Sequence, residues 1–479
     1  MKKITTLFLA AAMLCGAAST QAVDFKAQGE WVMSFEGGAG GSLTEDGYGN
    51  AGEDNFSARQ RVRLQLEAVA SEALSGTVYF QIGDQTWGNA EEGGALGADG
   101  RMVNVKQAYV DWLVPNTDLK LRMGLQGVSL PSFAGQQFSF DEDHSTAGIV
   151  ASYKFTENVA LTGMWLRLYN DNFTDTRADG RSGSNAHAQD NVDLFGLVLP
   201  LTFTGVNVTP WVVYGAVGQN YALDGNEDLH PGNLGFLMRP EAGSARADRL
   251  AADKHTLNAY SDLLLAGLTG EITVADPFRF AWDVQYSKLA TGEERYNQQG
   301  WFATLLAEYK VEWGTPGLYV WYASGEDDSL SNGSERMVSF GAQGGNEYAK
   351  FAFDGQDYIA RGAVLGDTMS GTWGVGARLA DMHFVENLKH SLRVNYIAGT
   401  NEKEGLEKLA LTERKYLTKE ESALEVGLST EYQVYENLVI NSDIAYLALF
   451  GEDYAFRKKA GEGDKADAWN ANVSFVYSF

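Results

Sequence analysis

The chain has 479 residues, with 37 basic and 63 acidic side chains and a formal net charge of −26 at pH 7. This acidic balance excludes nucleic acid as a partner, because the phosphates would repel the chain. The 54 glycines, 8 prolines and 12% aromatic residues are typical of a β-rich protein with many turns, and no Pro- or Ser-rich linker divides the sequence.

The first 22 residues are typical of a secretory signal peptide. Lys2 and Lys3 precede an apolar run over residues 4–18, and small residues lead to Ala22. We predict a signal peptide over residues 1–22 and one barrel domain over residues 23–479. Cleavage removes the only cysteine, Cys15, and with it disulfide and thiol chemistry. Beyond the signal no apolar run reaches about 18 residues, which excludes a helical membrane protein.

Alternation of apolar and polar residues is the main structural signal in the remaining chain. In segment 278–287, aromatic and aliphatic residues alternate with polar ones such as Arg279 and Asp283. A membrane barrel needs this pattern, because lipid-facing side chains must be apolar while lumen-facing ones are polar. About eighteen such segments predict an all-β, transmembrane antiparallel β-barrel. Segments 193–199 and 317–323 are apolar at odd and even positions alike, so they lack the alternation of the other strands. A barrel of sixteen strands, with one hairpin fewer, is therefore the alternative.

The placement of aromatic residues favours a membrane barrel over a soluble β-sandwich, which also alternates. Amphipathic rings collect at the bilayer interface, and many of the aromatic residues on the outward parity fall toward strand ends. These residues are Trp31, Trp112, Trp165, Trp282, Trp301, Trp313, Trp469 and Tyr477.

Short turns and long Gly/Asp/Glu-rich loops alternate along the chain. In outer-membrane barrels the short turns face the periplasm and the long loops face outward, so an even strand number places both termini in the periplasm. In the long loop at residues 399–422, helical spacing of leucines over residues 405–420 predicts a short external helix. Short turns fall near residues 71–76, 115–118, 156–158, 202–205, 275–277, 314–317 and 435–437, and other long loops at 37–55, 218–260 and 325–369.

The second strand carries three arginines on its lumen parity, Arg59, Arg61 and Arg63. The fifth strand adds Lys120 and Arg122. Like charges side by side would be costly in a packed core, so a water-filled lumen is the preferred explanation. A salt-bridge ladder that stiffens the wall is the alternative.

The loop after the fifth strand contains Pro131, Phe133 and Gly135, with Ser132 between the first two. It resembles the third loop of trimeric general porins, which folds into the pore through a Pro-Glu-Phe-Gly-Gly type turn. Ser132 departs from that pattern at the acidic position. The overall organisation resembles most the outer-membrane homotrimeric porins of sulfate-reducing bacteria. The resemblance implies an inward-folding third loop and a homotrimer.

Three acidic residues follow in this loop, Asp141, Glu142 and Asp143. If the loop folds inward, their carboxylates would oppose the arginines of the second strand and Lys120 and Arg122 across a pore constriction. Such an arrangement creates a transverse field that favours dipolar solutes. The alternative is a solvated loop tip.

The last strand ends on Phe479, with Tyr477 two residues earlier on the same face. This ending resembles the signal that the barrel-assembly machinery of the outer membrane recognises. The resemblance implies localisation to the outer membrane, in contact with its lipid and lipopolysaccharide.

Catalytic and metal-binding patterns are weak. The six histidines show no paired spacing, and no Ser/His/Asp set stands out, so we expect neither an enzyme nor a cofactor. Segment 224–228 begins like a calcium loop, but Leu229 stands at the sixth position, where glycine is needed. Incidental binding of Ca²⁺ by acidic external loops remains open.

These patterns favour an outer-membrane porin, a water-filled channel for passive diffusion of small hydrophilic solutes such as sugars, ions and small nutrients. A solute-selective channel for anions, carboxylates or sugars is the alternative within the same class, because a basic ladder concentrates such solutes. A structural or adhesive barrel with a filled lumen is the alternative from another class, and an outer-membrane lipase ranks below both.

Overall fold

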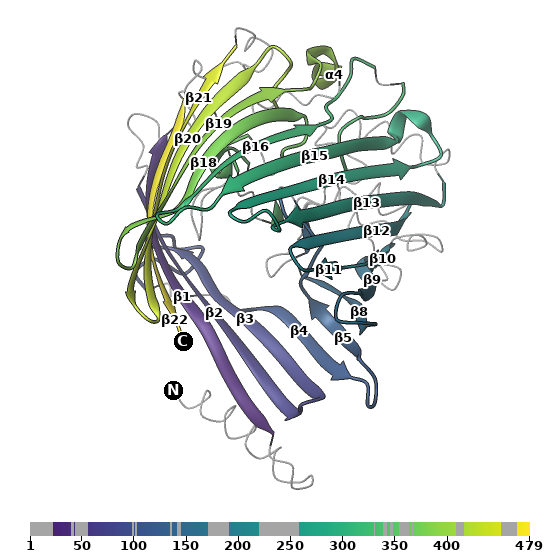
Figure 1. Cartoon of the computed structure of the whole chain (residues 1–479), viewed down its shortest axis with the longest axis vertical. Helices are drawn as coiled ribbons and strands as arrows, with labels where there is room; N and C mark the ends of the chain where they lie inside the picture. The colour runs from purple at the N-terminus through teal and green to yellow at the C-terminus, as the bar shows by residue number, and fades with distance from the viewer. Residues whose placement is uncertain are drawn as a thin grey trace.

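The computed structural model is one antiparallel sheet that closes on itself as a barrel (Figure 1). The first strand, β1, pairs with β2 on one side and with the last strand, β22, on the other, so every backbone edge is paired. β10 and β11 keep a single register against β12 and are two parts of one strand, interrupted at Pro200, which lacks an N–H donor. The described residues therefore form 18 strands, as predicted, and the sixteen-strand alternative is wrong.

The strands follow one another around the barrel in chain order. They are β1 (Asp24–Ala39), β2 (Phe56–Ser71), β3 (Leu74–Thr86), β4 (Val103–Leu113), β5 (Leu119–Gln126), β8 (Thr146–Lys154), β9 (Ala160–Asn170), β10 (Asn191–Val198) with β11 (Leu201–Phe203), β12 (Val206–Gly218), β13 (Tyr260–Ile272), β14 (Phe278–Ala290), β15 (Gln298–Tyr309), β16 (Thr315–Ala323), β18 (Thr372–Val385), β19 (Leu388–Gly399), β20 (Ser422–Tyr435), β21 (Leu438–Phe450) and β22 (Ala468–Ser478).

The structure describes residues 23–39, 43, 56–97, 100, 103–134, 137–140, 145–170, 191–219, 258–329, 331–338, 343–344, 348–353, 364–365, 368–408, 416–451 and 467–479. The predicted signal peptide lies outside these residues. Connections alternate between short and long as predicted, and we call the two ends of the barrel the short-turn end and the long-loop end.

Short elements outside the barrel wall lie in the connections. Two loops carry the strands β6 (Val128–Ser129), β7 (Gln137–Phe140) and β17 (Gln343–Gly344), which form a small separate sheet. The helical elements are η4 (Glu294–Tyr296), α3 (Lys350–Phe353) and α4 (Lys403–Lys408). α4 confirms a helix in the loop after β19, although it begins two residues before the predicted segment. No helix among the described residues has the length and apolar character needed to cross a membrane.

The outer face of the barrel is apolar and aromatic. Six of the eight aromatic residues predicted to face outward are well exposed there, among them Trp31, Trp301 and Tyr477. Trp165 and Trp282 are only partly exposed, and the Trp282 ring lies over a glycine of the neighbouring strand. This pattern is what a lipid-facing wall requires.

The inner face of the barrel combines polar residues with a large apolar cluster. Inward residues of β9–β16, including Leu194, Val213 and Tyr319, are buried in one cluster with loop residues such as Leu130 and Phe353. This cluster explains why segments 193–199 and 317–323 are apolar on both parities: their outward residues face lipid and their inward residues pack under loops that enter the lumen.

The C-terminus closes the barrel beside β1 (Figure 1). The Gly29 N–H donates to the Phe479 carbonyl at 2.8 Å, and the Phe479 N–H donates back at 3.0 Å. A side chain at Gly29 would lie 2.7 Å from the Phe479 ring, so the glycine gives that ring its room. The Tyr477 and Phe479 rings stack with centroids 5.8 Å apart.

Two lumen-side glycines provide a matched test of packing inside the barrel. A Cβ at Gly376 would lie 2.2 Å from Asn395 Oδ1 and 2.3 Å from the Tyr319 ring, whereas one at Gly427 would meet nothing within 4 Å. We expect Gly376→Ala to lower the free energy of unfolding by about 1–3 kcal/mol through overpacking, and Gly427→Ala to leave it nearly unchanged. Urea unfolding in lipid vesicles, followed by tryptophan fluorescence, measures both. Equal stability of the two variants would contradict this packing.

Candidate functional site

A buried carboxylate on the barrel wall holds the third loop inside the lumen. Asp283 of β14 is fully buried and accepts hydrogen bonds from the Ser132 hydroxyl at 2.7 Å, the Phe133 N–H at 3.0 Å and the Ala134 N–H at 2.8 Å. Thr269 of β13 donates its hydroxyl to the same carboxylate. Five strands separate β5 from β14 around the barrel, so the loop crosses the lumen to reach this anchor.

The anchored turn is part of a chain of ion pairs along the wall. Arg279 of β14 donates to the Phe133 carbonyl at 3.1 Å and pairs with Glu271 of β13 at 2.9 Å. It also pairs with Glu308 of β15 at 2.7 Å, and Glu308 in turn binds Arg378 of β18 at 2.6 Å. Glu308 and Arg378 are buried, where charged groups are stable only when paired, so the chain of ion pairs fixes both loop and wall.

A second loop, between β16 and β18, also enters the lumen. Its β17 pairs with β7 of the third loop, and its helix α3 packs against β20 and β21. Two long connections therefore meet inside the barrel and narrow its interior.

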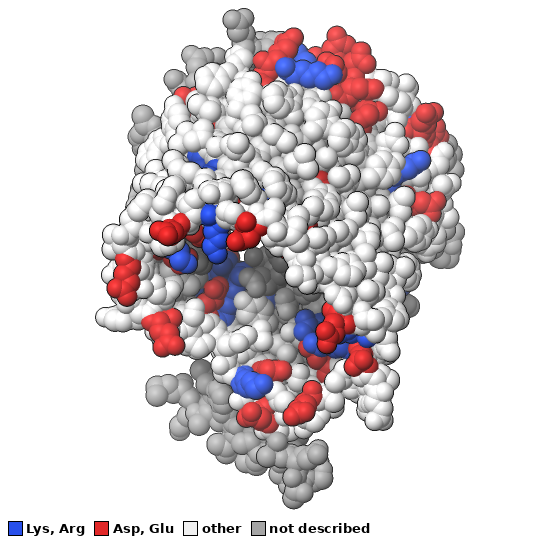
Figure 2. Space-filling view, viewed as in Figure 1, with Lys and Arg blue, Asp and Glu red and all other residues white. Residues whose placement is uncertain are grey.

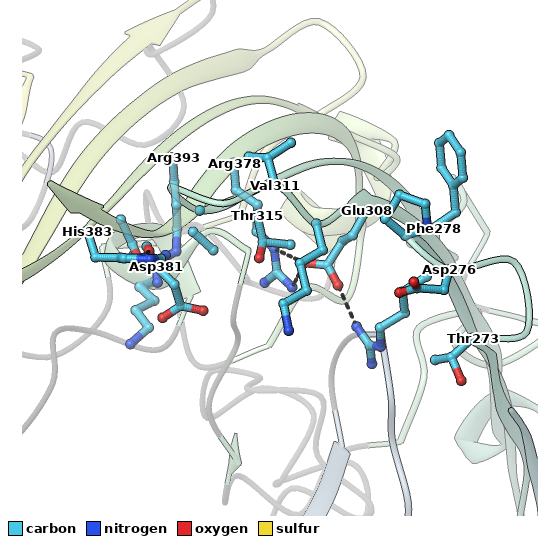
Figure 3. A pocket seen from close by; sticks show the side chains of 17 residues that line it. Thr273, Asp276, Phe278, Glu308, Val311, Thr315, Arg378, Asp381, His383 and Arg393 are labelled. Atoms are coloured by element: carbon cyan, nitrogen blue, oxygen red, sulfur yellow. Dashed lines mark hydrogen bonds and ion pairs between the residues drawn. The ribbon is translucent and has the colours of Figure 1, made fainter.

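A cavity of about 660 Å³ opens beside this network toward the short-turn end. In Figure 3, Glu308 lies between two guanidiniums on one side of the cavity, while Asp381, His383 and Arg393 lie together on the other. Figure 2 shows the matching hollow in the molecular surface, with Lys and Arg inside it and charged residues around its border. The ionisable lining consists of Arg279, Lys310, Lys350, Arg378, Arg393 and His383 with Asp276, Glu308 and Asp381.

The charge of this cavity is predominantly positive. Five lysines and arginines face three carboxylates in the lining. Arg378 and Arg393 are direct cross-strand neighbours on the lumen face, a pairing of like charges that destabilises a sheet. Arg393 donates to the Ser429 hydroxyl at 2.9 Å. A site of this kind attracts small anions and orients dipolar molecules by their negative end.

The three arginines predicted on the second strand lie on the lumen side of β2. Arg59 and Arg61 pair across the sheet with Ser34 and Val32, which are buried inside the barrel. Arg61 approaches Glu30 at 3.8 Å, and Arg63 donates to Gln81 at 3.1 Å.

On the fifth strand, the other two predicted cations share a single carboxylate. Arg122 binds Asp111 of β4 through two hydrogen bonds of 2.8 Å, and Lys120 lies 3.3 Å from the same group. Arg122 also lies over the Tyr109 ring at 4.0 Å. These contacts match the salt-bridge alternative for this pair, and a role in the pore constriction stays a prediction.

The turn of the third loop is placed only in part. Pro131 and Phe133 belong to the turn that Asp283 anchors, whereas Gly135 and the acidic residues Asp141, Glu142 and Asp143 lie outside the described residues. The acid that binds this turn is Asp283 on the wall, and sequence reasoning missed it. The only available signal was its polar position in the alternating segment 278–287.

The described residues contain no group of three or more His, Cys, Asp or Glu side chains placed to hold a metal ion.

A closed 18-strand antiparallel barrel with an apolar outer wall and a charged interior defines a transmembrane β-barrel fold. No protein-family model and no curated protein matches the sequence. Among solved structures, the chain is similar to three outer-membrane porins of Pseudomonas aeruginosa.

The three structures match nearly the whole chain. OccK11 (OpdR) is 11% identical with a TM-score of 0.51, over 95% of this chain and 96% of that one. OprD is 11% identical with a TM-score of 0.51, over 95% of each chain. OpdK, solved with vanillate, is 12% identical with a TM-score of 0.50, over 95% of this chain and 98% of that one. At such low identity these matches show a shared fold.

Removal of the Asp283 carboxylate should release the third loop. We expect Asp283→Ala to raise single-channel conductance and open-channel noise, because the Ala134 N–H loses its acceptor, at a cost of about 1–3 kcal/mol, and the Phe133 N–H keeps only the Thr269 hydroxyl. Planar bilayer recording measures both quantities. Asp262→Ala is the control, since Asp262 accepts from Tyr214 on the outer face. An Asp283→Ala channel that conducts like the control would refute the anchor.

Proposed function

We propose that this chain is an outer-membrane channel through which small hydrophilic solutes diffuse passively. The observation that carries the proposal is a charged cavity enclosed by a closed barrel with an apolar outer wall. Apolar residues outside suit lipid, and ionised groups inside require water. No bond is made or broken in such passage, so we do not propose an enzyme.

In this proposal the short-turn end faces the periplasm and the long-loop end faces outward among lipopolysaccharide. The predicted signal peptide is removed during export, and Tyr477 and Phe479 present the closing strand to the barrel-assembly machinery. Acidic external loops would bind Ca²⁺ only incidentally, where the ion bridges them to lipopolysaccharide phosphates.

The resemblance of the sequence to homotrimeric porins of sulfate-reducing bacteria supports a homotrimer. The outer wall is apolar around the barrel, which suits contact with lipid or with another copy. Migration as a heat-sensitive large species in detergent tests this assembly, and a monomer alone would oppose it.

The cavity favours anionic solutes over neutral ones within this function. Its five cations exceed its three carboxylates. Small carboxylates fit this chemistry, because guanidinium groups match their geometry. Vanillate, present in the OpdK structure, belongs to the same chemical class.

Bilayer recording in a KCl gradient tests this preference. We expect a reversal potential that indicates anion selectivity, and a shift toward cations in Lys310→Gln and Arg393→Gln. Each charge should alter the permeability ratio about threefold, because a unit charge roughly 13 Å away in water favours one ion and disfavours the other by about 0.3 kcal/mol. Lys389→Gln is the control, because Lys389 lies on the same strand as Arg393, outside the cavity lining, and pairs with Glu431.

Three other outcomes would redirect the proposal. Absence of conductance would favour a structural or adhesive barrel. Liposome swelling that follows the size of neutral sugars, with no anion preference, would favour a general diffusion porin. The same recordings on a channel in which Arg61 and Arg63 are both replaced by Ala test the predicted constriction. Unchanged conductance and selectivity would show that these two arginines do not form it.

A further inference from the structure

A short segment of the second inward loop packs against the inner wall of the barrel, and one of its side chains faces the cavity. In the run from Tyr348 to Phe353, which we call the wedge, all residues but Lys350 are buried with at most 1% of their surface exposed. Lys350 is partly exposed and belongs to the lining of the 660 Å³ cavity. The wedge therefore places a lysine in the solute pathway.

The first end of the wedge is held by aromatic stacking and hydrogen bonds. The Tyr348 ring stacks on Tyr319 of β16, with centroids 4.0 Å apart and planes 10° from parallel. Its hydroxyl accepts from Thr304 at 3.2 Å. Its backbone carbonyl accepts from the Tyr319 hydroxyl at 3.3 Å and from the Asn395 amide at 3.1 Å.

The other end of the wedge is held by a buried carboxylate. Glu425 of β20, with 1% of its surface exposed, accepts from the Ala352 N–H at 2.8 Å and from the Asn395 amide at 3.3 Å. Phe353 packs edge-on against Trp321 of β16. These contacts lie on both sides of Lys350 in the chain and restrict where its side chain can reach.

The neighbours of Lys350 in the cavity are mainly cations. Arg378 and Arg393 line the same cavity, and a small second pocket brings Lys350 and Arg393 together with the carboxylates Glu425 and Asp443. In the large cavity, Lys350 is one of five cations that outnumber three carboxylates, so its charge adds to the positive potential that solutes meet.

We propose that Lys350 is a specificity-determining residue of the channel, presented to anionic solutes by a loop segment rather than by the barrel wall. The inference rests on the proposed channel function. Tyr319, Asn395 and Glu425 act as positioning residues, since each touches the wedge and not the solute.

Charge changes at position 350 test the first part of the proposal. In a KCl gradient, we expect Lys350→Gln to lower the anion-to-cation permeability ratio about threefold and Lys350→Glu to lower it about tenfold, from one and two units of charge. Lys350→Arg should retain the wild-type ratio. Lys389→Gln is the matched control outside the cavity lining.

Coupling between Lys350 and its positioning residues tests the second part. Tyr319→Phe keeps the stacked ring but removes the bonds to Tyr348 and Asn395. We expect it to raise open-channel noise and to reduce the effect of Lys350→Gln when the two are combined, a non-additivity that a purely structural role would not produce. Retention of the folded form is checked first by heat-dependent migration in detergent.

The outcomes separate this inference from the proposed function. A wild-type channel that does not conduct overturns the proposed function, and one that prefers cations overturns its anion preference. An anion-selective wild type whose permeability ratio is the same in Lys350→Gln and Lys350→Glu overturns the inference alone. If the effects of Tyr319→Phe and Lys350→Gln are additive, the wedge does not position Lys350. Lys350 would then act only as one of the cations that line the cavity.

Discussion

The interior of this barrel depends on one requirement, that backbone groups brought into the lumen must find partners. A loop that leaves water carries N–H groups that are costly to bury unsatisfied. Asp283 meets this need for the third loop and Glu425 meets it for the wedge. Each is a carboxylate from the wall that accepts backbone N–H donors, so the same physical solution fixes both inward segments.

The two anchors explain why part of the inner wall is apolar. Inner residues of β9–β16 that the loops cover no longer meet water and can be apolar, as Leu194, Val213 and Leu263 are. Charged inner residues lie on β2, with Arg59, Arg61 and Arg63, and also on β14 and β15, where Arg279 and Glu308 line the cavity. The ion-pair chain from Glu271 through Arg279 and Glu308 to Arg378 follows the wall beside that cavity. A solute pathway through the cavity passes these charged groups.

The sequence predicted the structural features that repeat along the chain. It missed the contacts between residues that lie far apart in the sequence and meet only in the folded barrel. Alternation of period two predicted the strands, their number and the outward aromatic residues, because every lipid-facing strand obeys the same constraint. Asp283 looks like any lumen residue of its strand, and its role comes from Ser132 to Ala134, about 150 positions away. The wedge contains a helix of four residues, too short for helical periodicity, and its aromatic residues resemble those of a strand. Lys350 had no local signal, since its position depends on contacts made by its neighbours.

This chain shares its fold with porins that are only 11–12% identical, because the features that a barrel wall repeats can be met by many sequences. A barrel wall needs apolar residues outside, paired backbone edges and suitable turns, and many sequences satisfy those demands. Solute preference depends instead on a few charges at defined points of the lumen. Wall residues such as Arg378 are constrained, because their strands must keep register and their ion pairs must remain complete. Lys350 lies on a loop segment outside the barrel sheet, so a change of its charge does not alter the pairing of the strands.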